Sequence, residues 1–248
     1  MTSPPDRAAE TIAYHYRFDF GDGVHRDFDI QLRADTLELV PTGCGSPAPW
    51  TVLGFFRCPN CPLKAPPVVH CPIAASLAGL VNQLGDAVSY EETTVVIETQ
   101  SRQYAKQTSV QVGAGSLVGL LMVTAGCPIM DKLRPMACCH LPFATLKETA
   151  YRVLSMYLLA QYFVQKQGGE PDWQLKGLVT VYEDVQTVNK HFAQRIRNAA
   201  RQDASLNALV KLDSFAHYVS LMLEDGTLDE LEPVFAPYLN RYGPAPSP

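Results

Sequence analysis

Apolar and polar positions alternate along much of the first part of the chain, which is typical of β-strands with one buried face. Residues 12–20 and 24–32 follow this pattern and flank Gly21-Asp22-Gly23, a turn sequence typical of a β-hairpin. Residues 93–99 and 104–112 predict a second pair of strands. The first part of the chain therefore predicts two hairpins.

Apolar positions recur at helical spacing from residue 113 onward. Thr145 and Glu148 have the spacing of a capping box, in which each residue satisfies a backbone donor that is free at the start of a helix. The helix that they begin is expected to end at Gly168, and the next helix carries an apolar seam over residues 175–196. Asn189 is the polar member of that seam, and we expect it to form a hydrogen bond in the core.

Three further segments complete the pattern of elements. Residues 72–84 predict a helix between the two hairpins, and residues 209–223 predict a helix near the end of the chain. The segment around Pro233 and Pro237 is expected to be broken, because proline lacks the backbone donor that a helix uses.

The fold class that follows from these elements is α+β. We expect a β-rich part over residues 1–112, a helical part over residues 113–243 and a mobile tail over residues 244–248. With 248 residues, of which 47% are apolar and 18% charged, the chain can bury a sizeable core. We expect the two parts to fold as one cooperative unit.

Charge and hydropathy argue against several functional classes. The net charge of −5 at pH 7 disfavours a dedicated nucleic-acid-binding protein, since such proteins usually carry a basic surplus. Residues 112–130 carry no charge, but glycines and Pro128 leave too short an apolar stretch for a membrane span, so we expect a buried helix. Glycines within residues 113–119 depart from the spacing of a dinucleotide-binding loop, and close helix packing explains them more simply. Residues 1–10 are not followed by an apolar signal segment, so we expect a cytoplasmic protein.

Seven cysteines carry the candidate chemistry. In a reducing compartment, metal binding or catalysis explains cysteine better than disulfide formation does. Four of the cysteines are followed directly by proline, namely Cys58, Cys61, Cys71 and Cys127. Because proline suits the first position of a helix, Cys71 and Cys127 are predicted at helix N-termini, where free backbone donors and the helix dipole favour a thiolate.

These four cysteines predict a metal centre, because metal ligation requires deprotonated sulfur. Cys58 and Cys61 are separated by two residues, a spacing that lets both sulfurs reach one metal from a tight turn. Cys71 follows across a proline-rich loop, and Cys127 would join the helical part to the β-rich part. A four-iron (4Fe-4S) iron–sulfur cluster is slightly favoured over zinc, because such clusters accept one cysteine pair plus dispersed cysteines. We expect a structural or redox-sensing role.

The remaining cysteines and two histidines are weaker candidates. His70 and His140 flank cysteines and could each replace one ligand, although a hydrogen-bonded structural role is the simpler explanation. Cys44, Cys138 and Cys139 are most simply explained as structural residues.

Two other functional classes stay open. The apolar run at residues 50–56 predicts a strand that leads directly to Cys58, so the cysteine pair also resembles the active site of a thiol–disulfide oxidoreductase. That chemistry needs a helix at Cys58, which the following prolines disfavour. The other alternative is an unassigned enzyme with a site among four polar residues, Asp131, Arg134, His140 and Glu148.

Several motifs together resemble an uncharacterised family of bacterial proteins. They are Cys58-Pro-Asn-Cys-Pro-Leu, His70-Cys-Pro-Ile-Ala, Gly126-Cys-Pro-Ile-Met-Asp-Lys-Leu-Arg-Pro-Met136, His140-Leu-Pro-Phe-Ala144, Tyr157-Leu-Leu-Ala-Gln-Tyr-Phe163 and Pro171-Asp-Trp173. The resemblance covers roughly residues 55–215. It implies a bacterial, cytoplasmic protein, and it brings no activity or catalytic residue with it.

Overall fold

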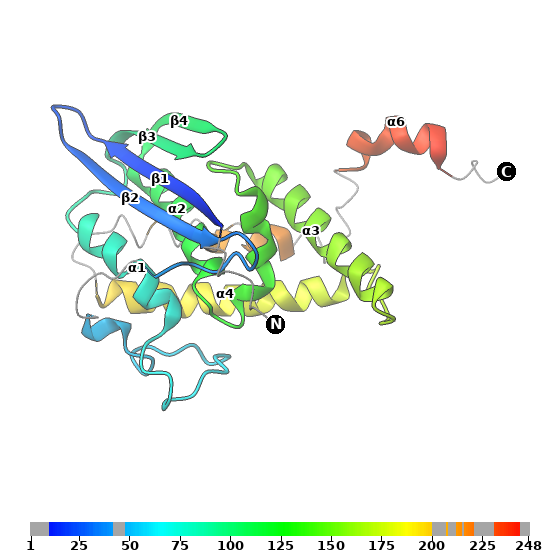
Figure 1. The fold of residues 1–248 in the computed structure, drawn as a ribbon, viewed down its shortest axis with the longest axis horizontal. Coiled ribbons are helices and arrows are strands. Elements are labelled where there is room, and N and C mark those ends of the chain that lie inside the picture. Colours follow the sequence, from blue (N-terminus) through cyan, green and yellow to red (C-terminus); the bar gives the residue numbers. More distant parts are fainter. Residues whose placement is uncertain are drawn as a thin grey trace, which may run out of the picture.

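A four-stranded antiparallel sheet forms one layer of the fold (Figure 1). The computed structural model describes residues 10–41, 48–199, 207, 212–214, 216–220 and 231–243. The strands lie in the order β2 (His25–Arg33), β1 (Thr11–Asp19), β3 (Glu92–Thr99) and β4 (Gln103–Ser109). Both predicted hairpins are confirmed, and Gly21 and Gly23 adopt positive φ angles in the first turn. The second hairpin ends at Ser109 rather than at residue 112, because a helix begins at Val110.

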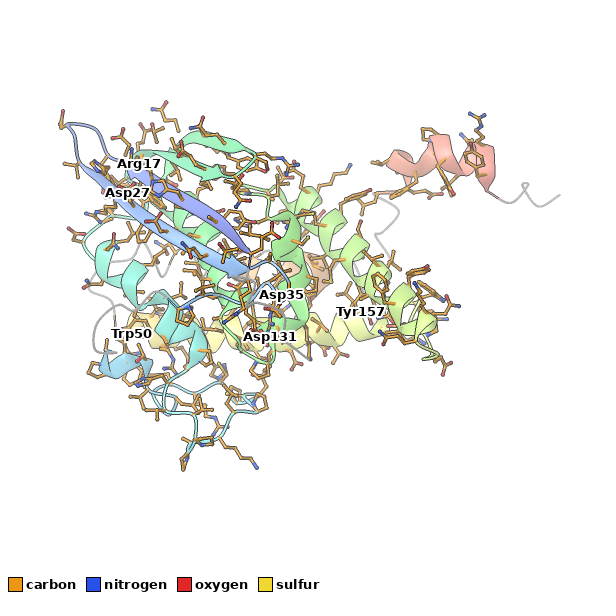
Figure 2. The ribbon with its side chains drawn as sticks, in the orientation of Figure 1. Arg17, Asp27, Asp35, Trp50, Asp131 and Tyr157 are labelled. Carbon is orange, nitrogen blue, oxygen red and sulfur yellow. The ribbon has the colours of Figure 1, made fainter. Side chains whose placement is uncertain are left out.

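The two faces of the sheet differ as the alternating pattern predicts. Tyr16 and Phe18 on β1 are fully buried, and their neighbours on the other strands continue the same apolar face. Arg17 and Asp27 lie side by side on the opposite face (Figure 2), with Arg17 Nε 2.8 Å from Asp27 Oδ1. The sheet therefore has one face in the core and one in solvent, as is common for antiparallel sheets.

Helices form the second layer and most of the chain after residue 110. Those that contribute to the core are α1 (Pro72–Gln83), α2 (Val110–Thr124), the 3-10 helix η2 (Met130–Cys139), α3 (Leu146–Lys166) and α4 (Lys176–Arg197). The short helix η1 (Pro49–Thr51) precedes α1, and α6 (Glu232–Tyr242) has no buried residue. The capping box at the start of α3 is confirmed, since Thr145 accepts from the Glu148 backbone and Glu148 accepts from the Thr145 backbone. The fold class is α+β, as predicted.

The core lies between the inner face of the sheet and the helices. Gly113 on α2 contacts the sheet so closely that an added Cβ would lie 2.7 Å from atoms of both Phe18 and Val95. This glycine therefore permits the close approach of α2, which is the role that the sequence favoured over dinucleotide binding. One buried apolar cluster includes residues from the sheet and from α1, α2, α3 and α4.

Two predicted elements are wrong. Residues 50–56 do not form a strand: η1 is followed by turns and an isolated bridge between Val52 and His70. The segment around Pro233 and Pro237 forms helix α6, in which Pro233 lies in the first turn, where a missing backbone donor costs little.

Some expectations fall outside the described residues. These include Cys44, the mobile tail and much of the predicted helix at 209–223, although residues 212–214 and 216–220 are helical. Within the part of the chain that the structure describes, no helix has the length and apolar character needed to cross a membrane. Most of the uncharged stretch at 112–130 lies in α2, whose residues are largely buried.

Candidate metal centre

The four cysteines that precede prolines line one small cavity of about 20 Å³. Cys127 is buried, and Cys58, Cys61 and Cys71 are half-buried. Apolar side chains form much of the remaining wall, including Leu53, Ile73, Ile129, Val188 and Phe192. The fold thus brings Cys127 from the helical part to the three cysteines of the first part.

Cys58, Cys61 and Cys71 come from the loop between η1 and α1. The Cys61 backbone N–H donates to the Cys58 carbonyl at 3.1 Å in a tight turn, and the Arg57 guanidinium donates to the Cys61 carbonyl at 2.8 Å. Cys71 is the N-cap residue of α1 and Pro72 is the first helical residue, so its predicted place at a helix N-terminus is confirmed.

Cys127 lies in the turn between α2 and η2, after Gly126 with φ +86°. The helix that follows is a 3-10 helix starting at Met130, so the expectation of a helix beginning directly at Pro128 is wrong in detail. Backbone N–H groups of Met130 and Ile129 nevertheless hydrogen-bond the Cys127 sulfur, which lowers its pKa, although burial raises the pKa more. These donors would stabilise a thiolate at this position.

Arg195 on α4 is the charged side chain that lines the same cavity from the helical part, and it is only 2% exposed. Its guanidinium donates to the carbonyls of Trp50 at 2.8 Å, Val52 at 2.9 Å and Leu53 at 3.2 Å. Trp50 accordingly lies beside the C-terminal end of α4 in Figure 2. Arg195 therefore fixes the segment that leads into Cys58.

The acidic groups that interact electrostatically with Arg195 are the thiols of the cysteines that line the cavity. Burial lowers the pKa of the Arg195 guanidinium, and negative charge on Cys71, Cys58 and Cys61 would raise it. Such a cation is costly to bury unless an anion balances it.

Without a metal, burial favours the neutral thiol form of Cys58 and Cys127. Burial raises the pKa of Cys58 to about 12, and negative charge on Cys71, Cys127 or Cys61 would raise it further. A coordinated cation reverses this effect, because it stabilises the thiolates directly. Within the described ranges, no three His, Cys, Asp or Glu side chains could hold a metal ion as they stand. Ligation therefore requires the thiol side chains to turn toward a common centre.

The weaker candidate ligands lie elsewhere. His70 Nδ1 is 2.9 Å from the Thr51 hydroxyl, and His140 lines a different and larger cavity. Cys138 and Cys139 are exposed at the end of η2. None of these residues lines the cavity of the four cysteines.

Polar residues of the alternative enzyme site are dispersed over three places. Arg134 pairs with Asp131 and, at 3.2 Å, with Glu38 on the first part of the chain. Glu148 caps α3, and His140 is half-buried beside Tyr16. The residues are therefore not joined in one acid–base constellation.

Thiol–disulfide chemistry is disfavoured by two features of Cys58. Redox-active cysteines usually have a lowered pKa at the start of a helix. Residues 58–61 form a turn instead, and the pKa of Cys58 is raised by burial.

Two features of the protein were not predicted from the sequence: Arg195 and the larger cavity that His140 lines. Arg195 follows the seam residue Phe192 by three positions, which places it on the apolar face of α4. An arginine at that position in the apolar pattern was the feature of the sequence that could have indicated a buried positive charge.

His140 gives the fold a dependence on pH. Its Nε2 lies 2.6 Å from the Tyr16 hydroxyl, and burial, assisted by the charge of Arg152, lowers its pKa to about 3. The stability that this neutral histidine provides is complete above about pH 6.5 and is lost as the pH falls, because the unfolded chain then binds a proton that the folded chain does not.

We therefore expect the unfolding free energy to fall by about 1.4 kcal/mol for each pH unit between roughly pH 6.5 and pH 3. Denaturant unfolding at about pH 7 and about pH 4.5 would measure the slope, which should be much smaller in His140→Gln. His25→Gln, at the exposed hairpin turn, is the matched control and should keep the full slope. Equal slopes in His140→Gln and the unmodified protein would contradict the expectation.

Comparison with known proteins identifies one family. A family model described as a domain of unknown function (DUF6901) matches residues 12–236. No curated protein and no solved structure matches the chain.

Proposed function

The chain belongs to the DUF6901 family, a domain of unknown function, and we propose that Cys58, Cys61, Cys71 and Cys127 together bind one metal centre. This centre would order the proline-rich loop at residues 58–71 and fasten it to the helical part. Three ligands come from that loop and one from the turn after α2.

The observation that carries the proposal is Arg195, a buried cation on the wall of the same cavity as four thiols. Four thiolates around a divalent ion leave a net negative charge at the site. That charge would balance the guanidinium, which otherwise is buried against carbonyl groups. The negative charge of the metal centre and the positive charge of Arg195 would thus balance each other.

Size favours a single ion over a cluster. A volume of about 20 Å³ holds roughly one water-sized sphere. Zinc needs only the space at the centre of four sulfurs, and structural zinc sites are closed tetrahedra of this kind. We therefore propose zinc first, which reverses the slight preference that the cysteine spacing gave to an iron–sulfur cluster.

An iron–sulfur cluster is the second candidate, since one close cysteine pair plus two dispersed cysteines is a known ligand pattern for it. A cluster would add a redox response to the structural role. Either centre requires reduced thiols, which is consistent with a cytoplasmic location.

Metal analysis of anaerobically purified protein, with its visible absorption spectrum, tests the proposal. We expect about one zinc per chain and no colour, and the blue-green colour of a tetrahedral thiolate site after cobalt replaces zinc. Serine in place of any one of the four cysteines should lower the zinc content, whereas Cys138→Ser and Cys139→Ser are the matched controls that should not. Brown protein with iron and sulfide would identify the cluster instead. Metal-free protein in which Cys58, Cys61, Cys71 and Cys127 all titrate as free thiols would contradict both versions.

A further inference from the structure

A second cavity, of about 390 Å³, lies among α2, η2, α3 and α4. Its volume is within the range of about 300–1,000 Å³ that small-molecule ligands occupy. The wall is mostly apolar and includes Met122, Val123, Leu133 and Val185. No residue lines both this cavity and that of the four cysteines, so an inference about one is independent of the other.

Asn189 supplies an unsatisfied acceptor on the wall of this cavity. The side chain is 2% exposed, and its Oδ1 is buried without a hydrogen-bond partner among the described residues. The sequence predicted a core hydrogen bond for Asn189, but among the described residues no group donates to this oxygen. Because buried acceptors are rarely left unpaired, this oxygen is suited to accept a hydrogen bond from a ligand in the cavity.

The charged side chains on the wall of the large cavity are positive. Lys106 and Arg152 line it, and the described lining residues include no Asp or Glu. Arg152 is held in place by a hydrogen bond of 2.8 Å to the Met136 carbonyl. His140 adds no charge near neutral pH, because burial lowers its pKa to about 3. A ligand with an acidic group would complement this wall.

Arg152 and Asn189 lie at different points along the cavity. Arg152 acts electrostatically on Tyr182, and Tyr182 precedes Asn189 by two helical turns on the same face of α4, a distance of about 10 Å. An extended molecule of medium length can therefore reach both ends at once.

We propose that this cavity binds an apolar carboxylate of medium chain length, whose acidic group pairs with Arg152 and whose far end donates a hydrogen bond to Asn189 Oδ1. The apolar body would lie against the methionine, valine and leucine side chains of α2, η2 and α4. This assigns to the protein a ligand site that does not depend on the metal centre.

Isothermal titration calorimetry of the full-length protein with three probes tests the proposal. The probes are decanoate, ω-hydroxydecanoate and decanol, each below its aggregation limit. Decanoate should bind about tenfold or more tightly than decanol, because only decanoate pairs with the guanidinium, and the hydroxyl of ω-hydroxydecanoate should add a further gain.

Three variants locate the binding. Arg152→Met should remove the preference for decanoate over decanol, and Arg152→Lys should retain much of it, since lysine keeps the charge. Asn189→Leu, nearly equal in size to the native side chain, should abolish the gain from the hydroxyl but leave decanoate binding unchanged. Circular dichroism melting curves verify that each variant is folded.

The exposed apolar face of α3 provides the control for surface binding. Tyr162 and Phe163 are each about half exposed there and do not line the cavity. A Tyr162→Ser, Phe163→Ser double variant should bind all three probes unchanged. Loss of binding in that variant, equal binding of decanoate and decanol, or unaltered selectivity in Arg152→Met would each overturn the proposal.

Discussion

Replacing Cys127 with serine is expected to abolish stoichiometric metal binding and to lower the unfolding free energy by several kcal/mol. Cys127 is the ligand that the proposed centre would take from the helical part, and its loss leaves three cysteines of a single loop on the wall of the cavity. Bound zinc contributes about 10–16 kcal/mol of binding free energy in small structural sites, and part of this becomes folding stability. Denaturant unfolding of the two proteins, with metal content measured in parallel, gives the difference.

A chelator separates the metal contribution from simple packing. In its presence the difference between the unmodified protein and Cys127→Ser should shrink to about 1–2 kcal/mol, the cost of a hydroxyl at a buried position. Cys138→Ser changes an exposed cysteine and should match the unmodified protein under both conditions. If the full difference persists in the chelator, the stabilisation comes from packing of the sulfur and not from a metal.

Local sequence patterns predicted those elements whose residues contact mainly their neighbours in the chain. The hairpin around Gly21-Asp22-Gly23 follows from alternation plus a turn that needs positive φ angles. The start of α3 follows from the capping box of Thr145 and Glu148. In both cases the stabilising partners lie within a few residues, so the sequence contains the relevant information.

Errors arose where a distant residue decides the local structure. The apolar run at 50–56 has the composition of a strand, but Arg195, far along the chain, donates hydrogen bonds to three of its carbonyls. Those carbonyls are then not free to pair with a neighbouring strand. No periodicity within the run could have indicated this.

The sequence predicted that the four cysteines would lie together, but not what surrounds them. The cysteine–proline pairs marked Cys58, Cys61, Cys71 and Cys127, which line one cavity. The buried cation beside them and the large cavity around Asn189 depend on how α4 packs against three other segments. Such packing follows from the whole fold, which one sequence does not reveal.

Replacing Arg195 with methionine is expected to lower the unfolding free energy by about 3–5 kcal/mol, the range for removing one partner from a buried charged network. The variant loses three hydrogen bonds and leaves the carbonyls of Trp50, Val52 and Leu53 without their donor. Arg197→Met, two residues further along α4 at an exposed position, is the matched control and should change stability by less than about 0.5 kcal/mol.

Substitutions of Arg195 should affect zinc affinity and folding stability differently. This difference tests whether the charge of Arg195 balances that of the thiolates. Arg195→Lys keeps the positive charge but cannot reproduce the planar fork of donors to three carbonyls, so it should be destabilised almost as much as Arg195→Met. Competition with a chelator of known affinity should nevertheless show zinc binding retained in Arg195→Lys and weakened roughly tenfold or more in Arg195→Met, because only the lysine balances the anionic site. Equal zinc affinity in the two variants would mean that the guanidinium serves the loop backbone alone, and the charge balance between Arg195 and the thiolates would then have no role in metal binding.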